Sequence, residues 1–406
     1  MQKFEKRSPV VVTEVTTKHE LRQFMQYPNR LYADNPNYIP SFYGDDLSDW
    51  TPGKNPAFDY CEARCWLARR DGEIVGRIGA ILSHKANDKF GTHRMRFSQV
   101  DFVDDSEVSA ALFGTVERWA REKGCDQVHG PLGFTDMDRE GMLVEGFDRR
   151  SLFFTNYNAP YYLEHLTRLG YRKDVDWIEY RITVPEPGGA EAERLHKLSE
   201  FILKRKHLHV ATVHHKSEYG PFVRQVFELV NAAYAPLYGV VELSDEQIER
   251  YANKFIPLVD PDFVCFVVDE QDQLVAFGVT ALDPSVALKH SDGRLFPFGW
   301  AGVLNDLHHS DTLIMLLTAV RPDLQTEGIN AVMMDHVCQS CNRHGVRFAE
   351  TGPMLELNDH ILAQWKRLEK EQHKRRRCFI KDLDHDVNAA NAAAAQTETP
   401  ETESAE

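Results

Sequence analysis

The sequence predicts an α/β protein built from two tandem mixed-sheet domains, each with helices on both faces of its sheet. Two observations carry this prediction. Each half contains two strand patterns joined by a polar turn, over residues 65–82 and 262–282, and each then continues with alternating helix and strand patterns. Residues 311–320 are almost entirely apolar, which is typical of a central strand covered on both faces. The repeated order indicates a duplicated architecture.

The elements that follow each strand pair are read from periodicity. Helix patterns cover residues 106–124 and 161–170 and begin again near Gly328 and Asn358. Strand patterns cover residues 176–184, 346–352 and 375–383. In both halves, the sequence pattern therefore predicts a strand pair followed by strand, helix, strand, helix and strand.

The boundary between the halves is expected where Pro and Gly cluster, in VPEPGGAEAE, residues 184–193. We expect an N-terminal domain over residues 10–185, a linker over 186–194 and a C-terminal domain over 195–383. Residues 384–406 are acidic and poor in large apolar side chains, so they are expected to form a disordered tail.

The composition argues against several classes of protein. The formal net charge is −15, and an acidic body does not suit broad nucleic-acid binding, which requires neutralisation of phosphates. No run of about 18 apolar residues predicts a membrane span, and no signal sequence is evident, so a cytoplasmic protein is expected. Seven scattered cysteines suit reduced thiols. Residues 336–344, HVCQSCNRH, do not predict a metal site, because one helix cannot surround a tetrahedral ion.

The segment LTAVRPDLQTEGINAVMMDHV, residues 317–337, carries the most informative functional pattern. Its strand ends at Pro322, which has no N–H group for a ladder bond. Gly328 permits a positive φ angle or a close approach of another group. The helix that follows directs its first N–H groups, and the positive end of its dipole, into the loop. This arrangement favours an anion.

Val320, Pro322, Gln325 and Gly328 match the pattern V-x-P-x-x-[QR]-x-x-G-x-[GA], so the segment resembles the acetyl-CoA-binding motif of the GNAT (Gcn5-related) N-acyltransferase superfamily. The resemblance implies two tandem GNAT-like domains and acetyl-CoA or a longer acyl-CoA as co-substrate, without a metal. It implies CoA binding, chiefly through backbone N–H groups, by Val320, Gln325, Thr326, Glu327, Gly328, Ile329 and Asn330. Asn330 stands where the pattern has a small residue.

The resemblance extends over about residues 10–383. Residues 130–148, 158–173 and 350–358 are similar to a poorly characterised bacterial family with two GNAT-like domains. It implies catalytic roles for Glu350 and Glu356 and a cofactor-binding role for Asn358.

The first domain lacks the anion loop, and no CoA is expected there. Asp104 and Asp105 stand before its helix, where carboxylates stabilise the helix but would repel a pyrophosphate. The Gly- and acid-rich residues 130–148 are either a turn-rich loop or part of a substrate cleft between the domains.

N-acyl transfer needs one group that accepts the amine proton and another that protonates the leaving thiolate. Glu350 is expected at the exposed end of a strand beside the cofactor helix, where a base is useful, although a structural ion pair also explains it. Glu356 is either a second catalytic carboxylate or a first-turn helix residue. Many relatives carry a Tyr as general acid where this chain has Trp365. The candidates for the acid are therefore Tyr234, Tyr238, His308, His309 and water.

Two further segments leave alternatives open. Residues 366–377 contain seven Lys or Arg and two Glu. They form either a solvated helix end and edge strand, or a patch for the CoA 3′-phosphate or an anionic membrane. Residues 287–307 include Leu295, Phe296, Phe298 and Trp300. They either pack as core or line an apolar groove for an acyl chain or a lipid.

These observations favour an acyl-CoA-dependent N-acyltransferase that moves an acyl group from a thioester to an amine. The acceptor is a small molecule, a protein amine or a long-chain amino lipid, as in ceramide-type N-acylation. A lipid acceptor would bring peripheral contact with the inner membrane face. Two alternatives are a non-catalytic binding module with a relic cofactor site, and a tRNA-dependent aminoacyl transferase, which would need a basic groove. The sequence does not indicate an oligomeric state.

Overall fold

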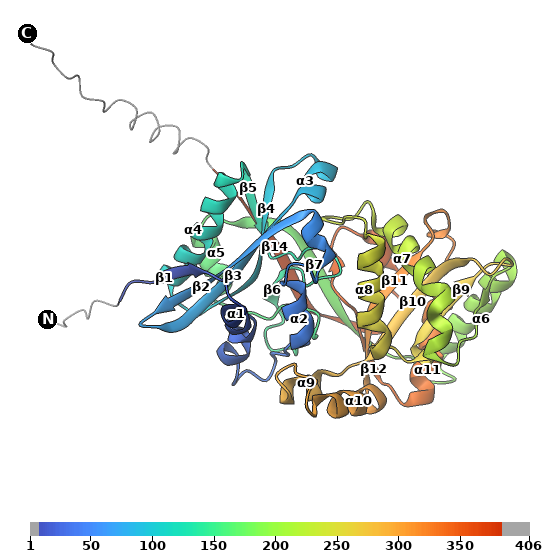
Figure 1. The fold of residues 1–406 in the computed structure, drawn as a ribbon. Coiled ribbons are helices and arrows are strands. Elements are labelled where there is room, and N and C mark those ends of the chain that lie inside the picture. The colour runs from blue at the N-terminus through green and yellow to red at the C-terminus, as the bar shows by residue number, and fades with distance from the viewer. Residues whose placement is uncertain (1–7, 384–406) are drawn as a thin grey trace, which may run out of the picture.

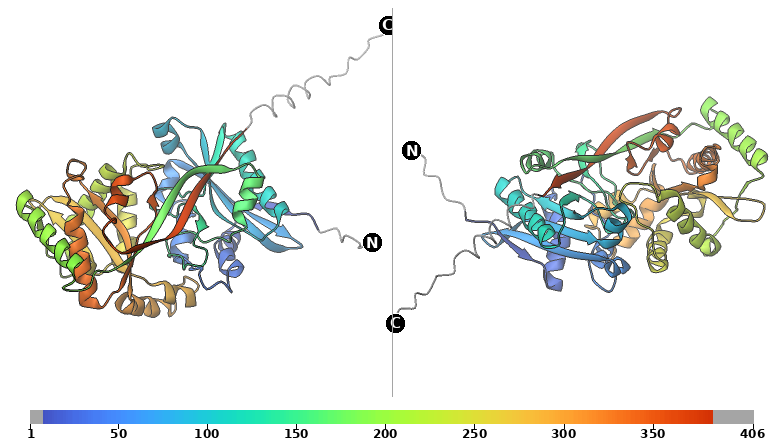
Figure 2. Two further views of the ribbon diagram at one scale, coloured as in Figure 1. Left: turned by 180° about the vertical axis from the view of Figure 1, so that it is seen from behind. Right: turned by 90° about the horizontal axis from the view of Figure 1, so that it is seen from above.

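One mixed β-sheet runs through both lobes of the molecule (Figure 1). The computed structural model describes residues 8–383, and the predicted tail over 384–406 lies outside the described residues. The strand order is β1-β2-β3-β4-β5-β14-β7-β12-β11-β10-β9-β8, with β6 added to β14 and β13 added to β7. Helices cover the sheet on both faces (Figure 2). The structure confirms the predicted α/β class with a mixed sheet.

The first half of the chain supplies the following elements: β1 Val11–Glu14, α1 Lys18–Leu31, α2 Tyr43–Asp49, η1 Pro56–Asp59, β2 Cys61–Arg70, β3 Glu73–Ser83, α3 His84–Phe90, β4 Arg94–Phe102, α4 Ser106–Glu122, β5 Gln127–Gly130, β6 Met142–Glu145, α5 Tyr162–Arg168 and β7 Arg172–Thr183.

The second half supplies these: α6 Ala190–Lys206, β8 His209–Val210, η2 Lys216–Tyr219, α7 Gly220–Tyr234, α8 Asp245–Phe255, η3 Ile256–Leu258, η4 Pro261–Phe263, β9 Val264–Val268, β10 Leu274–Leu282, α9 Ser285–His290, α10 Gly299–His309, β11 Thr312–Val320, η5 Pro322–Leu324, α11 Asn330–His344, β12 Phe348–Glu350, β13 Met354–Leu355, α12 Asp359–Ala363 and β14 Lys370–Asp382.

The two lobes repeat one motif. In the first lobe, the antiparallel strands β2, β3 and β4 lead through α4 to β5, which lies parallel to β4. In the second lobe, the antiparallel strands β9, β10 and β11 lead through α11 to β12, which lies parallel to β11. A parallel pair needs a crossover connection, and in both lobes a helix supplies it. The structure therefore contains the duplicated order that the sequence pattern predicts.

The strands β7 and β14 cross from one lobe to the other (Figure 2). β14 lies between β5 and β7, although its residues were expected in the C-terminal domain. β7 in turn pairs with β12 of the second lobe. The expected linker over residues 186–194 also differs, because α6 already begins at Ala190. The division expected at the linker therefore separates the helices of the two lobes but does not separate the sheet.

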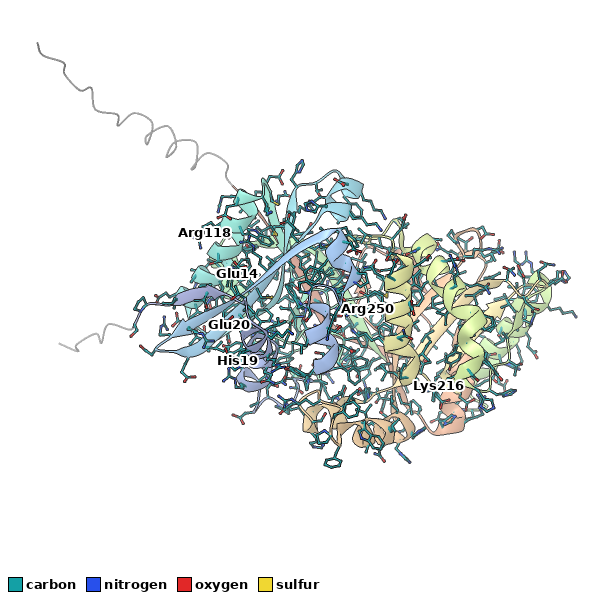
Figure 3. All side chains as sticks on the ribbon, in the orientation of Figure 1. Glu14, His19, Glu20, Arg118, Lys216 and Arg250 are labelled. Atoms are coloured by element: carbon teal, nitrogen blue, oxygen red, sulfur yellow. The ribbon has the colours of Figure 1, made fainter. Side chains whose placement is uncertain are left out.

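Ion pairs between α8 and α2 connect the two lobes in addition to the shared sheet. Arg250 of α8, labelled in Figure 3, reaches toward α2, where it pairs with Asp49. Lys254, one turn further along α8, lies 3.5 Å from the Asp49 carboxylate and 3.7 Å from that of Asp45. Among residues 8–383, no helix is both long and apolar enough to cross a membrane. All seven cysteines lie in this range, and each is a buried free thiol.

The basic run near the C-terminus is internal in part: two of its seven Lys and Arg side chains are buried, and β14 lies inside the sheet rather than at the solvated edge that was one of the two expectations. Lys374 and Arg376 of β14 have fully buried side chains, and both pair with the buried carboxylate of Glu179 on β7. The Lys374 ammonium lies 3.2 Å from Glu179 and 3.3 Å from Glu350. Burial alone would raise the pKa of Glu179, but the charges of Arg376 and Lys374 outweigh it and lower the pKa to about 2.

The Glu179→Gln variant is expected to lower the free energy of unfolding by about 3 kcal/mol, because it leaves two buried cations without their main partner. The folded pKa of Glu179 lies below its ordinary value of 4.5. The ionised carboxylate therefore stabilises the fold fully above pH 4.5, and this contribution is lost as the pH falls through about 2. Urea unfolding at several pH values measures both effects.

Glu371→Gln is the matched control for this variant. Glu371 lies on β14, the strand that also carries Lys374 and Arg376, but its side chain is 52% exposed and pairs with Arg149 at the surface. Its loss should cost less than about 1 kcal/mol. Equal effects of the two substitutions would contradict the role assigned to the buried cluster.

Candidate functional site

The candidate site lies where β11 and β12 separate. The two strands pair in parallel only from Thr312 to Ile314 of β11. After Glu350 the chain turns away, and β13 pairs with β7 instead. On its other side β11 stays paired with β10 as far as Val320. In the described part of the chain, residues 315–320 of β11 thus have a strand partner on one side only, and their other side is here called the unpaired edge.

A β-bulge bends β11 at the same place. Val279 of β10 lies opposite Leu317, and the next residue, Thr280, lies opposite Met315, so Leu316 is the extra residue of β11. A bulge of this kind bends a strand and redirects a side chain, and bulges are frequent next to active sites. The bulge brings Leu316 to the wall of both cavities described next.

Two apolar cavities flank the unpaired edge. The α7–α8 cavity, of about 240 Å³, is lined by α7, α8, β9, β10 and β11, and by residues 136–140 of the first lobe. The α11–α12 cavity, of about 180 Å³, is lined mainly by α11, β10, β11 and the segment from Ile361 to Leu368. The two share the wall residues Tyr234, Val279, Leu316, Leu317, Gly352 and Pro353. They therefore adjoin each other at the edge of β11.

The loop between β11 and α11 has the features of an anion site. Gly328 has a φ of +81°, and a Cβ atom there would lie 3.2 Å from the Ile202 side chain of α6. Within residues 8–383, the backbone N–H groups of Gln325, Thr326 and Gly328 have no hydrogen-bond acceptor. Free N–H groups before a helix N-terminus attract an anion.

Positive charge lies beside this loop. The last turn of α6 carries Lys204, Arg205 and Lys206. Lys206 lies 2.6 Å from Glu327 of the loop, and this contact and the nearby Arg205 lower the pKa of the Glu327 carboxyl. The loop's own cation, Arg321, pairs with Asp323 at 2.8 Å, so the α6 cations add positive charge beside it, and nothing in the pattern of residues 317–337 could have indicated them.

The structure places the predicted CoA-binding residues as follows. Val320 and Ile329 are buried in the core between β11 and α11. The Gln325 side chain closes the loop by donating to the Val320 carbonyl at 3.3 Å, and Thr326 is exposed. Asn330 is the first residue of α11, and it lines the α11–α12 cavity. Asn358 caps α12, where its side chain accepts from the Ile361 N–H at 3.3 Å.

The two predicted catalytic carboxylates both lie in ion pairs. Glu350 is buried between Lys374 and Arg181, at 3.3 and 3.4 Å, and lines neither cavity. Glu356 pairs with Lys173, and its other oxygen lies 2.9 Å from Arg375. Such partners occupy the lone pairs that a base would use. A catalytic role for Glu350 or Glu356 stays a prediction, and the geometry favours other carboxylates.

Those carboxylates come from the first lobe. Asp136, Asp138 and Glu140 line the α7–α8 cavity among apolar side chains. Asp138 holds the loop together, since its carboxylate accepts from the N–H groups of Phe134 and Thr135 at 2.8 and 3.2 Å. In the described chain, Asp136 and Glu140 have no ion pair and no hydrogen bond to another residue. The sequence feature that could have indicated these carboxylates is the alternation of acids at 136, 138 and 140 within residues 130–148.

Burial shifts the titration of both unpaired acids. Burial, with a smaller contribution from the Asp138 charge, raises the pKa of Asp136 to about 6. Burial and the charge of Asp136 raise the pKa of Glu140 well above its usual range. A carboxyl group whose pKa approaches neutrality in an apolar cavity is suited to exchange a proton with a substrate.

Among the candidate acids, Tyr234 is the best placed. Its ring lines both cavities, and its hydroxyl donates to the Thr318 carbonyl of β11 at 2.7 Å. Burial, together with the charge of Asp136, raises the pKa of Tyr234, so the hydroxyl keeps its proton. Trp365 lines the α11–α12 cavity, with its indole N–H 3.2 Å from the Met354 sulfur. His308 and His309 lie at the end of α10 and line neither cavity.

Tyr238, the other tyrosine candidate, lies in a polar cluster outside the cavities. His129, Asp174 and Cys378 form the one group in the described chain with the spacing of a metal site. The Tyr238 hydroxyl lies 2.5 Å from Asp174, 2.9 Å from His129 and 3.5 Å from the Cys378 sulfur. The hydroxyl thus stands close to all three would-be ligands. The cluster is explained as a hydrogen-bond network between the lobes.

Comparisons with known proteins agree with this architecture, although no protein-family model matches the chain. The chain is 27% identical over 379 residues to Protein YghO of Escherichia coli (strain K12), covering 92% of this chain and 95% of that protein. It is 28% identical over 300 residues to a protein named Bacterial ceramide synthase from Caulobacter vibrioides (strain NA1000 / CB15N), covering 72% of this chain and 75% of that protein.

A solved structure shows the same fold. A tandem GNAT protein from the clavulanic acid biosynthesis pathway superposes with a TM-score of 0.52 at 14% identity, covering 92% of this chain and 99% of that one. At this level of identity the likeness concerns the fold alone. The predicted tandem GNAT architecture is thereby confirmed.

Proposed function

We propose that this tandem GNAT chain is an acyl-CoA-dependent N-acyltransferase whose acceptor is a long-chain amino lipid. The observation that carries the proposal is the meeting of two apolar cavities at the unpaired edge of β11. One cavity adjoins the helix that follows the anion loop, and the other holds the unpaired carboxylates. A donor with a charged phosphate end and an acceptor with a basic nitrogen would approach this edge from opposite faces of the sheet.

The donor side matches the parts of an acyl-CoA. The free N–H groups around Gly328, with the cations of α6 beside them, suit the pyrophosphate. The pantetheine arm carries two amides, and the unpaired edge of β11 offers the backbone partners that an extended amide chain needs. The α11–α12 cavity accommodates apolar parts of the donor, and Asn330 on its wall offers one polar contact.

The acceptor side suits an amine on an alkyl chain. In the proposed reaction, the amine nitrogen attacks the thioester carbonyl, an amide C–N bond forms, and the C–S bond breaks. Asp136 accepts the proton that leaves the nitrogen, and Glu140 beside it orients the amine. The CoA thiolate leaves and takes up a proton from the Tyr234 hydroxyl at the junction of the cavities, and the resulting tyrosinate regains a proton from solvent. The apolar remainder of the α7–α8 cavity holds the alkyl chain.

The name of one relative supports a lipid acceptor. The Caulobacter vibrioides protein, which is 28% identical over 300 residues, is called a bacterial ceramide synthase, and a ceramide is the N-acyl derivative of a long-chain amino alcohol. The lining of both cavities points the same way, because it is mainly apolar and suits alkyl chains.

The test is a direct assay in detergent. Purified full-length protein is incubated with acyl-CoAs from acetyl to long-chain and with a long-chain 2-amino-1,3-diol, and the N-acyl product and released CoA are measured by mass spectrometry. Amide formation with release of CoA is the expected result. Calorimetric binding of acyl-CoA without turnover of any amine would support the alternative of a non-catalytic binding module and overturn the proposal.

The Tyr234→Phe variant is expected to lower kcat by roughly 10²-fold, because it removes the proton donor while keeping the ring on the cavity wall. Steady-state kinetics at saturating acyl-CoA measure the effect. Tyr219→Phe is the matched control, since Tyr219 lines the same cavity and its buried hydroxyl has no partner in the described chain. A similar loss in both variants would contradict the role of Tyr234.

A further inference from the structure

The helical hairpin over residues 285–309, here called the aromatic hairpin, exposes large apolar side chains. It comprises α9, α10 and their connection. Phe296 and Phe298 are 80% and 81% exposed, and Trp300 and Leu304 are 48% and 45% exposed. The sequence left this segment open between core and groove; in the structure Leu295 packs against the core, whereas the four exposed side chains lie in neither the core nor the two cavities. A cluster of exposed aromatic residues marks an interaction surface.

The aromatic hairpin is held firmly by the first lobe. The Tyr43 N–H donates to the Gly293 carbonyl at 2.9 Å, and the Lys289 ammonium donates to the Asn35 carbonyl at 2.7 Å. A Cβ atom at Gly293 would lie 1.9 Å from the Ser41 carbonyl oxygen, so the backbones are in close contact there. The exposed rings are therefore presented by a fixed scaffold, at the edge of the molecule where α9 and α10 lie in Figure 1.

The polar groups of the aromatic hairpin fit an apolar and anionic environment. The Trp300 indole N–H donates to the Pro297 carbonyl at 3.1 Å, so burying the ring leaves no donor unpaired. From Arg294 to His309 the sequence contains a single carboxylate, Asp306, and that side chain accepts from the Ala287 N–H at 2.7 Å. In a chain with a net charge of −15, the stretch from Leu295 to Leu304 that exposes the rings contains no acidic residue, and Arg294 precedes it. The one exposed carboxylate of the hairpin, Asp292, lies close enough to the Lys289 ammonium to act on its charge.

The core beneath the aromatic hairpin continues into the wall of the α7–α8 cavity. Ala287, Leu288 and Val303 pack in a cluster against which Phe154 and Leu316 also pack. Phe154 and Leu316 line that cavity. The hairpin is therefore one packing layer away from the space that we assign to the alkyl chain of the acceptor.

We infer that the aromatic hairpin docks the protein on the surface of an anionic lipid bilayer, with Phe296, Phe298 and Trp300 inserted among the headgroups. Aromatic residues with basic neighbours are characteristic of interfacial anchors, and the basic residues add attraction to anionic lipids. This inference rests on the proposed function, because a lipid acceptor resides in a bilayer. Docking here would place the acceptor cavity beside the membrane that supplies the amine.

The first experiment measures binding without catalysis. Full-length protein is floated with vesicles of phosphatidylethanolamine and phosphatidylglycerol, and the Phe296→Ser/Phe298→Ser double variant is compared with Phe201→Ser, which changes an exposed phenylalanine on α6 outside the hairpin. The double variant should reduce the vesicle-bound fraction by roughly 10-fold or more, and the control should bind as the parent does. Absence of vesicle binding by the parent protein, or equal binding by the double variant, overturns the inference.

The second experiment separates docking from catalysis. With a long-chain amine in detergent micelles, the double variant should match the parent, whereas with the amine embedded in vesicles its rate should fall by roughly 10-fold. Loss of activity in both settings would overturn the assignment to docking. Sedimentation measures the oligomeric state of both proteins. If the parent protein is a dimer and the double variant is a monomer, a second copy of the chain covers this surface, and the inference of membrane docking is overturned.

Discussion

The Gly328→Trp variant is expected to lose measurable binding of acyl-CoA. Gly328 has a φ of +81°, which a residue with a side chain rarely adopts, and its missing Cβ would stand 3.2 Å from Ile202. An indole at this position would fill the loop whose N–H groups around residue 328 are free and would shield them from a phosphate. Calorimetry with acetyl-CoA and a long-chain acyl-CoA measures the effect, and unchanged affinity would remove the main argument for a CoA site.

Gly345→Trp controls for damage to the helix. Gly345 ends α11 with a φ of +70°, so a side chain there suffers similar backbone strain, but a Cβ atom would meet nothing within 4 Å. Both variants should therefore lose a similar amount of stability, while only the Gly328 variant should lose affinity. If both lost affinity equally, the effect would belong to α11 as a whole and the loop would not be the binding site.

The strand–loop–helix connection around Gly328 was predictable because its determinants are neighbours in the sequence. A proline after a strand, a glycine six residues later and an amphipathic helix are all local patterns, and in the structure β11 ends at Val320 and α11 begins at Asn330. Asn330 shows the limit of a pattern match. The motif has a small residue there, yet the structure puts the residue on the wall of a cavity, where a polar side chain has room.

The position of β14 could not be predicted, because strand order depends on pairing between distant residues. Lys374 and Arg376 resemble a solvated charge run until Glu179, almost two hundred residues earlier, is known to lie beside them. The placement of β14 between β5 and β7 also explains why Glu350 is paired with Lys374 and Glu356 with Arg375. The resemblance alone implied catalytic roles for these two acids.

The acceptor side was hidden for a similar reason. The cavity that holds Asp136 and Glu140 has walls from both halves of the chain, and neither half contains a pocket-forming pattern by itself. The sequence predicts that the acid-rich residues 130–148 form either a turn-rich loop or part of a substrate cleft. Only the folded arrangement shows which of its acids are engaged: Asp138 supports its own loop, whereas Asp136 and Glu140 face apolar side chains without partners in the described chain.

Replacing Asp136 with Asn is expected to lower kcat/KM by roughly 10³-fold, because the amide cannot accept the proton of the attacking amine. Burial raises the pKa of Asp136 to about 6, so the activity of the parent enzyme should rise as the pH increases through about 6, as the base becomes ionised. The residual activity of the variant should lack this rise. Initial rates between pH 5 and 8, with a long-chain amine in detergent, measure both effects.

The same substitution distinguishes a catalytic group from a structural one. A folded pKa above the ordinary value of 3.8 means that ionisation of Asp136 opposes folding, and this cost is present in full above about pH 6. Asp136→Asn should therefore be at least as stable as the parent protein at pH 7, even though its activity is lost. Asp138→Ala should instead lose stability, because one oxygen of the Asp138 carboxylate accepts two backbone N–H groups that alanine would leave without this acceptor. An Asp136 variant that unfolded more easily would assign this carboxylate to the fold and leave the base unidentified.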